Sequence, residues 1–327
     1  MSTVFRPFDN NLLEEWTDWL NGVTKRFGAV GYGNASKCIS VDRIRSAITS
    51  TDLLLSIALE DQGCERGIIV ITHARWEESV IHKPVAKVVF FAADSFSTAH
   101  KIAREAIRKS AEHGIVLLSA TPGQSPTFIH VALTEAGFHV GSQSMTVQAD
   151  LQRIAPAVAR IPLRGKFRPA RHEDADAVAE IARTGFANAR FTSDPFFPSE
   201  WGGKLYATWA RNLVLGAADA VVVAEQRDRI VGFVSMCMDE DRRRRVPDLM
   251  AVDVKLDGLG IGVMLVRHML DWYRERGLKL MVGGTEKNNT AINALYARLG
   301  FLFLDVNICY HASPALSPLR ERLATTM

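Results

Sequence analysis

The sequence predicts an α/β protein built from two similar mixed-sheet halves, of which the N-terminal one is degenerate. Residues 85–151 have the pattern of strand, helix, strand, helix and strand, and residues 248–311 repeat that order. The length of 327 residues also exceeds the size at which a single hydrophobic core usually stops growing. Two domains are therefore expected.

A helical segment is expected before the first half. Apolar residues recur there at helical spacing: Leu12, Leu13, Trp16, Trp19 and Leu20. A second apolar-periodic run covers 41–59. Its end is open to two interpretations, because 53–73 fits either continued helix or two strands joined by a turn at Gln62-Gly63.

Each half is predicted from its own alternation of apolar runs and amphipathic stretches. The first has strand 85–93, helix 97–114, strand 115–120, helix 127–137 and strand 138–151. The second has strand 248–254, helix 262–277, strand 278–284, helix 289–300 and strand 301–311. The ends of the two copies align locally, with Gly137 matching Gly300 and Leu133 in the place of Tyr296.

The region after the first half contains three prolines and basic residues without steady periodicity, which is typical of a linker. We therefore predict an N-terminal domain over 1–155, a linker over 156–166, a second domain over 167–315 and a tail over 316–327.

Composition excludes several classes of protein. The formal net charge of +3 is too small to indicate a nucleic-acid or membrane surface. The four cysteines are scattered and have no metal-ligand spacing, which favours reduced thiols in a cytoplasmic protein without a metal. The N-terminus lacks the apolar core of a signal peptide, and no apolar run is long enough to span a bilayer.

Three alternating glycines, Gly258, Gly260 and Gly262, precede the helix predicted over 262–277. Backbone N–H groups at a helix N-terminus bind phosphates, and glycine allows the close approach that this requires. A Walker loop would end in Gly-Lys-Ser/Thr, and a dinucleotide fingerprint would have glycine where Val263 stands. The pattern therefore indicates a pyrophosphate site of another kind.

Two motifs carry a resemblance to a known family. The stretch AVDVKLDGLGIG over 251–262 resembles the acetyl-CoA loop of the GNAT N-acetyltransferase superfamily, and NNTAINALYARLGF over 288–301 resembles its later helix. The resemblance covers about 167–311 and implies an acetyl-CoA cosubstrate. It departs from the family at Asp257, where Arg or Gln is usual and where a carboxylate would repel a pyrophosphate.

The resemblance also implies roles for individual residues. Main-chain groups of Val252 and Val254 would pair with the pantetheine arm, and Asn289 would contact the cofactor. The pyrophosphate would be held by the loop amides of Gly258, Leu259, Gly260, Ile261, Gly262 and Val263. Tyr296 would protonate the leaving thiolate, although a lone tyrosine is also a common core residue.

No residue is selected as the general base, because the spacing of Asp239, Glu240 and Asp248 favours none of them and water would serve equally well. The run Arg242 to Arg245 fits either a ligand phosphate or a solvated turn.

The acceptor amine is predicted from residues 186–216, an aromatic segment with two prolines. Aromatic side chains on a loop stack on planar rings or sugar faces, although covering the core explains them equally well. The segment is similar to GNAT enzymes that act on a nucleotide-linked 4-amino-deoxysugar, which also carry a reduced N-terminal half. The substrate-side residues expected on this basis are Phe191, Asp194, Tyr206, Trp209 and Asn212.

The sequence thus predicts direct transfer of an acetyl group from acetyl-CoA to the primary amine of a nucleotide-linked amino sugar. Two alternatives stay open: acetylation of another small amine, and a non-catalytic acyl-CoA-binding sensor or scaffold. A homodimer is one candidate assembly.

Overall fold

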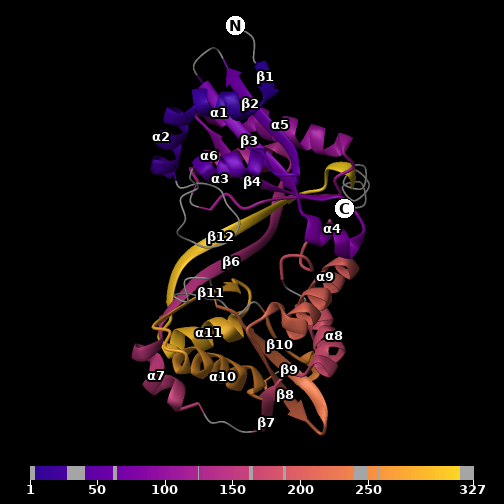
Figure 1. The fold of residues 1–327 in the computed structure, drawn as a ribbon, viewed down its shortest axis with the longest axis vertical. Helices are drawn as coiled ribbons and strands as arrows, with labels where there is room; N and C mark the ends of the chain where they lie inside the picture. Colours follow the sequence, from indigo (N-terminus) through magenta and orange to yellow (C-terminus); the bar gives the residue numbers. More distant parts are fainter. Residues whose placement is uncertain are drawn as a thin grey trace. The chain divides into compact units, whose positions relative to one another are not determined.

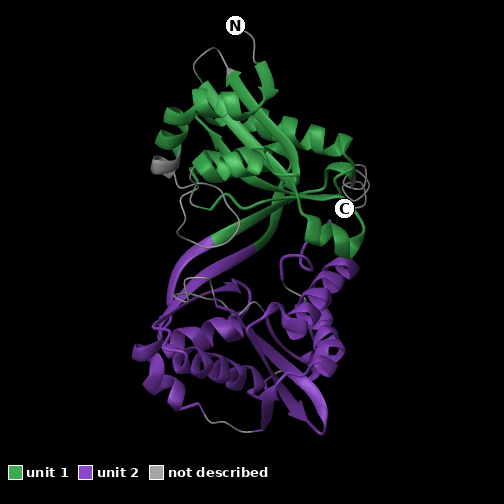
Figure 2. Cartoon of the chain, viewed as in Figure 1, with its two compact units in different colours: residues 1–142, 307–327 green, residues 143–306 purple. Residues whose placement is uncertain are grey.

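The computed structural model describes residues 4–27, 41–61, 65–123, 125–161, 165–186, 189–238, 249–256 and 258–316 (Figure 1). The chain forms two compact units, drawn in different colours in Figure 2. Unit 1 comprises residues 1–142 and 307–327, and unit 2 comprises residues 143–306.

Unit 1 is a mixed sheet with helices on both faces. Its elements are β1 (Val4–Pro7), α1 (Asn10–Glu15), α2 (Thr17–Phe27), α3 (Val41–Ile48), β2 (Leu53–Asp61), β3 (Glu65–His73), α4 (Arg75–Ile81), β4 (Val85–Ala93), α5 (Phe96–Glu112), β5 (Leu117–Ala120), α6 (Thr127–Ala136) and the start of β6 (His139–Asp150). The strands are antiparallel neighbours in the order β1-β2-β3-β4, β5 then joins β4 in parallel, and the end of β12 (Leu302–Ala312) joins β5 antiparallel. Within 53–73, residues 53–61 and 65–73 are thus two antiparallel strands, and the predicted turn at Gln62-Gly63 lies outside the described residues.

The apolar run of β3 is continuous because both faces of this strand are buried. Ile69 and Ile71 pack in one cluster with α5 and α6. Ile68 and Val70 pack in a second cluster with α1 and α3 around Trp16, which is fully buried. The predicted helical N-terminus therefore covers the second face of the sheet.

Unit 2 contains a four-stranded antiparallel sheet in the order β10-β9-β8-β7. Strands β6 and β11 pair antiparallel and belong to the other, eight-stranded sheet. Its elements are α7 (Leu151–Ala159), β7 (Lys166–Pro169), the 3-10 helix η1 (His172–Asp174), α8 (Ala175–Gly185), α9 (Ser199–Asn212), the π-helical turn η2 (Leu213–Ala217), β8 (Ala220–Gln226), β9 (Arg229–Met236), β10 (Met250–Val252), the 3-10 helix η3 (Val254–Leu256), α10 (Ile261–Glu275), β11 (Leu280–Glu286) and α11 (Thr290–Leu299). A last 3-10 turn, η4 (Pro314–Leu316), follows β12 in unit 1.

The predicted linker differs from the structure over 156–159, which belong to α7. The side chain of Asp150 caps this helix by accepting from the N–H groups of Gln152 and Arg153. Ile154 and Val158 bury its apolar face in the core of unit 2. Burial of that face and the cap outweigh the hydrogen bond that Pro156 removes from the helix.

The last strand of each copy ends in the unit of the other copy. Strand β6 begins in unit 1, and its residues 144–150 pair with β11 in unit 2. Strand β12 begins in unit 2, and its residues 310–312 pair with β5 in unit 1. Both strands therefore change colour along their length in Figure 2. The compact units accordingly divide the chain at 142 and 306, and not at the predicted 155 and 167.

The local match between the copies extends to their helix ends. Gly137 and Gly300 both adopt the left-handed conformation, with φ of 109° and 88°. In the first copy the N–H of Phe138 donates to the carbonyl of Leu133, and in the second the N–H of Phe301 donates to that of Tyr296, each at 3.0 Å. Leu133 and Tyr296 are thus equivalent positions.

Gly300→Ala is expected to lower the free energy of unfolding by about 1 kcal/mol, because only glycine adopts this left-handed conformation without strain. Urea unfolding of the two proteins measures the change. Gly284→Ala is the matched control, since its φ is not positive and an added Cβ meets nothing within 4 Å. A Gly300→Ala midpoint no lower than that of the control would contradict this account of the helix end.

Candidate functional site

The chain turns sharply between β10 and the glycine loop. The N–H of Asp253 donates to the carbonyl of Val231, and its side chain accepts from the N–H of Lys255. The strand therefore ends at Val252, and Val254 begins the 3-10 helix η3. The prediction that Val254 lies in the strand is wrong. Sequence reasoning missed Asp253, whose side chain accepts from the N–H two residues later, as aspartate commonly does in a turn.

The glycine loop presents open space at the start of α10. Gly258 and Gly260 have φ of 81° and 78°, and a Cβ built on either meets nothing within 4 Å. Gly262, in the first turn, would bring a Cβ no closer than 3.8 Å to Val252. Among the described residues, no side chain caps α10. Its first N–H groups, at the positive end of the helix dipole, are therefore open to an anion.

The equivalent helix of unit 1, α5, begins with side chains instead of glycines. Ser95 caps it by accepting from the N–H of Thr98, and both hydroxyls donate to the carboxylate of Glu65. Asp94 accepts from the N–H of Arg66 and from the indole of Trp19. Two carboxylates of the chain thus lie at the start of α5. At the equivalent start of α10, no described side chain caps the helix.

The edge of β10 is the second feature of the site. Val252 pairs with Gly232 of β9, and β10 is the last strand of its sheet. Within unit 2, β11 pairs with β6 and not with β10. Over the described residues, the main-chain groups on the outer side of β10 are therefore available to an extended ligand, which would add to the sheet as another strand.

Tyr296 lies on α11 and is 3% exposed. Its ring stacks on Phe301 with centroids 4.4 Å apart, in the hydrophobic cluster against which Val252, Ile261 and Val263 also pack. The loop residues and the tyrosine therefore contact one cluster. Burial raises the pKa of Tyr296 well above the usual value of a phenol, so the hydroxyl is protonated at neutral pH.

The buried phenol of Tyr296 should make the protein less stable in alkali. Unfolded tyrosine loses its proton near pH 10, whereas the folded state keeps it. Its contribution is fully present below about pH 10 and is lost as pH rises, with a slope of about 1.4 kcal/mol per pH unit. Urea unfolding of the wild type and of Tyr296→Phe between pH 9 and 11 measures this contribution as the difference between their free energies of unfolding. Parallel curves for the two proteins would contradict it.

The remaining predicted cofactor residues lie on the surface. Leu259 is 62% exposed at the tip of the loop. Asn289 is exposed and caps α11, because its side-chain oxygen accepts from the N–H of Ile292 at 3.3 Å. Capping of the helix is enough to account for an asparagine at this position, with no ligand needed. The side-chain NH₂ group can still donate hydrogen bonds to a cofactor.

The predicted acceptor residues are divided between core and surface. Phe191, Asp194 and Tyr206 are buried, and Tyr206 stacks between Phe186 and Trp209. Of these five residues, only Trp209 and Asn212 keep appreciable exposure. The rings thus form part of the packing of α8, α9 and the loop between them, and a role in binding stays a prediction.

Sequence reasoning also missed Gly202, which lets α9 approach the loop closely. A Cβ there would lie 2.2 Å from the carbonyl oxygen of Phe191. The adjacent Gly203 would bring one within 3.1 Å of the carbonyl oxygen of Arg183. The signal was two glycines inside a helix that is otherwise amphipathic.

Asp257, the arginine run 242–245 and the acidic residues Asp239, Glu240 and Asp248 lie outside the described residues.

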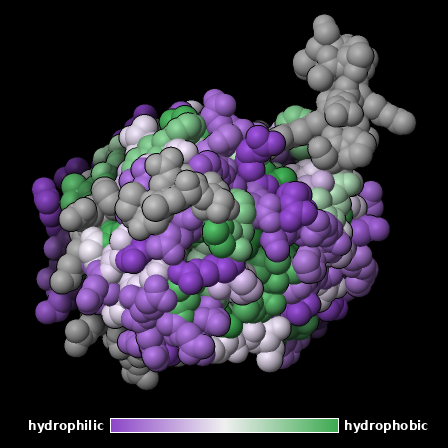
Figure 3. Space-filling model, turned by 90° about the horizontal axis from the view of Figure 1, so that it is seen from above, coloured by the Kyte–Doolittle hydropathy of each residue, from purple (hydrophilic) through white to green (hydrophobic). Residues whose placement is uncertain are grey.

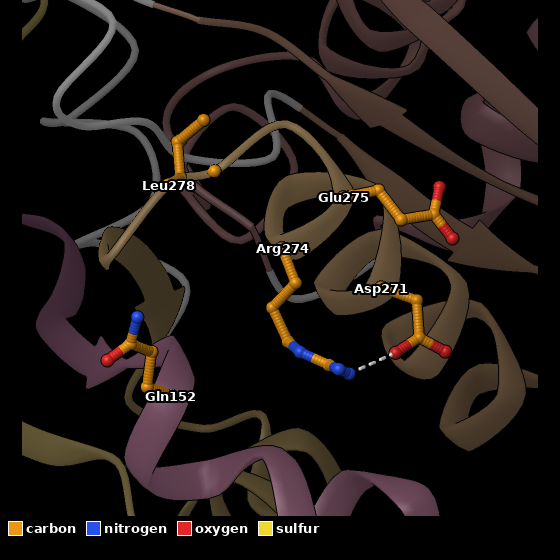
Figure 4. A pocket seen from close by; sticks show the side chains of 6 residues that line it. Gln152, Asp271, Arg274, Glu275 and Leu278 are labelled. Carbon is orange, nitrogen blue, oxygen red and sulfur yellow. Dashed lines mark hydrogen bonds and ion pairs between the residues drawn. The ribbon is translucent and has the colours of Figure 1, made fainter.

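A pocket of about 300 Å³ lies at the opposite end of α10 (Figure 4). It is lined by Gln152, Asp271, Arg274, Glu275, Gly277 and Leu278. Arg274 forms a salt bridge with Asp271, with 2.8 Å between Nη1 and Oδ1. Since a helix rises 1.5 Å per residue, the pocket is roughly 20 Å from the glycine loop and is not part of the site.

The face of the molecule seen from above is mostly hydrophilic, with smaller hydrophobic patches (Figure 3). None of the helices in the described part of the chain has the length and apolar character needed to cross a membrane.

Comparison with known structures shows the fold. The tandem GNAT protein from the clavulanic acid biosynthesis pathway superposes with a TM-score of 0.55 at 13% identity, over 96% of this chain and 99% of that one. A glucosamine N-acetyltransferase region of a fungal multi-domain GH3 beta-N-acetylglucosaminidase has a TM-score of 0.59 at 13% identity, over 95% of this chain and 38% of that one. The prediction of two GNAT-like halves is thereby confirmed.

Two curated relatives are similar in sequence. Spore coat polysaccharide biosynthesis protein SpsD of Bacillus subtilis (strain 168) is 23% identical over 288 residues, 84% of this chain and 96% of that one. The dTDP-fucosamine acetyltransferase of Escherichia coli O6:H1 is 29% identical over 136 residues, 40% of this chain and 56% of that one. Residues 187–301 match the Acetyltransferase (GNAT) family, as the two motifs indicate. The chain therefore carries a GNAT acetyltransferase domain and is an acyltransferase.

Proposed function

We propose that this protein transfers an acetyl group from acetyl-CoA directly to the primary amine of a nucleotide-linked amino sugar. The observation that carries the proposal is the uncapped start of α10, where Gly258, Gly260 and Gly262 leave the N–H groups accessible. These amides would bind the pyrophosphate of coenzyme A. The free edge of β10 at Val252 would pair with the amides of the pantetheine arm.

The chemistry follows from this placement. The neutral amine attacks the thioester carbonyl, a C–N bond forms and the C–S bond breaks. The amine nitrogen gives up its extra proton to water or a base, and the departing thiolate takes one from the hydroxyl of Tyr296. A phenol kept neutral by burial holds a proton that it can donate, which suits this role, although its raised pKa makes its placement decisive.

One cofactor per chain is expected. In unit 1, Glu65 and Asp94 bring carboxylates to the start of α5, where they would repel a pyrophosphate. Leu133 stands in the place of Tyr296 and has no proton to donate. The first half is therefore proposed to have a structural role and not to turn over acetyl-CoA.

The acceptor is proposed from the relatives, one named for polysaccharide biosynthesis and the other for acetylation of dTDP-fucosamine. Partly exposed Trp209 and exposed Asn212 on α9 are suited to contact a sugar or base, as a stacking ring and a hydrogen-bonding amide.

The test combines calorimetry and turnover. Acetyl-CoA is titrated into the purified chain, and release of free thiol is then followed with a dTDP-linked 4-amino sugar, a free amino sugar, an amino acid and a polyamine as acceptors. We expect one cofactor site and turnover with the nucleotide-linked sugar, inhibited competitively by free dTDP. Turnover with another amine, insensitive to dTDP, would refute the acceptor. Cofactor binding without turnover of any acceptor would favour the sensor alternative.

A further inference from the structure

Two histidines of unit 1 face each other on strands β6 and β12. His139 begins β6 and is half-buried, and His311 lies near the end of β12 and is fully buried. Their rings are perpendicular with centroids 6.2 Å apart. Their ligand nitrogens lie within 4.8 Å of each other.

Gly141 gives His311 its position. A Cβ built on Gly141 would lie 2.4 Å from Nδ1 of His311 and 2.6 Å from two carbons of the ring. Any other residue would displace the imidazole from the backbone of β6. His139 and Gly141 project from the same face of this strand, since successive side chains alternate. The glycine therefore holds the ring of His311 beside that of His139.

A third histidine of unit 1, His130, contacts a tyrosine and not another histidine. His130 of α6 contacts the hydroxyl of Tyr310 at 3.1 Å through Nδ1. Tyr310 precedes His311 on β12, so its side chain projects from the opposite face of the strand. Burial lowers the pKa of His130, which keeps this imidazole neutral. The facing pair is thus distinct from the packing of His130.

Paired neutral imidazoles are ligands for borderline transition metals, which bind nitrogen at about 2.0–2.1 Å. Two nitrogens on a tetrahedral Zn²⁺ are roughly 3.3 Å apart. The present separation is at most 4.8 Å, so the two nitrogens would have to approach by no more than about 1.5 Å to reach that span. A hard cation such as Mg²⁺ or Ca²⁺ prefers oxygen and is not suited to this pair.

We propose that His139 and His311 bind a divalent transition-metal cation of the Zn²⁺ class. The cation would connect β6 to β12 and so tie the end of the chain into unit 1. Two imidazoles leave coordination positions for water or other donors. The sequence did not predict this site, because the two histidines are far apart in the chain and lack any metal-ligand spacing.

The test is calorimetric titration of the untagged, chelator-treated full chain with Zn²⁺ at pH 7.5, with Co²⁺ as a spectroscopic probe. We expect one saturable site per chain with a Kd of roughly 1–100 µM, and a higher unfolding temperature when Zn²⁺ is bound. Binding should weaken in acid, because protons compete with the metal for the imidazole nitrogens.

His139→Ala is the decisive variant, because a half-buried residue at the start of a strand should be replaceable without loss of the fold. It should abolish this binding and the Co²⁺ absorption. Gly141→Ala keeps both imidazoles and should weaken binding by displacing His311. His113→Ala removes an exposed histidine and should bind like the wild type. The proposal is overturned if His139→Ala binds Zn²⁺ as tightly as His113→Ala, or if the wild type shows no saturable binding up to 1 mM Zn²⁺.

Discussion

Gly262→Glu should weaken acetyl-CoA binding at least roughly 100-fold, since like charges near 4 Å repel by about 4 kcal/mol at an intermediate effective dielectric constant. The new carboxylate would occupy the start of α10, where the pyrophosphate is proposed to bind. The fold should survive, because a Cβ at Gly262 makes only an ordinary contact with Val252 and an acidic residue suits a helix N-terminus. Calorimetry with acetyl-CoA measures the effect.

The control is Gly262→Gln, which adds a side chain of the same size without the charge. It should weaken binding by less than roughly tenfold if electrostatic repulsion dominates. Equal losses in the two variants would mean that crowding, and not charge, excludes the cofactor. Unchanged binding in Gly262→Glu would place the cofactor away from the loop.

Gly262→Glu would place a carboxylate at the start of α10 in unit 2. Unit 1 already has a carboxylate at the start of the equivalent helix, α5. Glu65 accepts from the hydroxyls of Ser95 and Thr98 at the start of α5. Residues 93–97, ADSFS, contain no glycine where the second copy has DGLGIG, which indicates loss of the phosphate loop from the first copy. Only the structure identifies what fills the place, because Glu65 comes from a different strand, distant in the sequence.

The sequence predicted the local structure best where one residue type is required by the backbone. Gly258, Gly260 and Gly300 all have positive φ, which makes glycine nearly obligatory. The helix of 262–277 was predicted almost to its ends, since α10 spans Ile261–Glu275. Features of this kind depend on a short stretch of chain, so the local sequence is enough to predict them.

Long-range pairing could not be predicted in the same way. The alternation of side chains in β6 and β12 shows which residues face the core. It does not show which neighbouring strand each of them pairs with. The exchange of their ends between units was therefore invisible in sequence. The aromatic segment was ambiguous for a similar reason, since buried Tyr206 and partly exposed Trp209 stack together and have the same spacing signal.

Tyr296→Phe should lower kcat by roughly 10²–10⁴-fold, the usual range for loss of a general acid, while acetyl-CoA binds as in the wild type. The substitution removes only the hydroxyl, so the stacking on Phe301 at 4.4 Å should persist. Leu133 shows that this position of the repeat accepts a side chain without a hydroxyl.

The measurement separates an enzyme from a sensor, because a sensor has no thiolate to protonate and should behave alike in both forms. Turnover with the best acceptor is compared with calorimetric binding of acetyl-CoA to the same preparations. A matched variant is Tyr310→Phe, which removes a phenol of unit 1 and should leave kcat near the wild-type value if the transfer takes place in unit 2. A fall confined to Tyr296→Phe, with cofactor affinity retained, would assign proton donation to this hydroxyl. An equal kcat for Tyr296→Phe and the wild type would mean that the thiolate leaves unprotonated or takes its proton from water, and the catalytic role of Tyr296 would have to be given up.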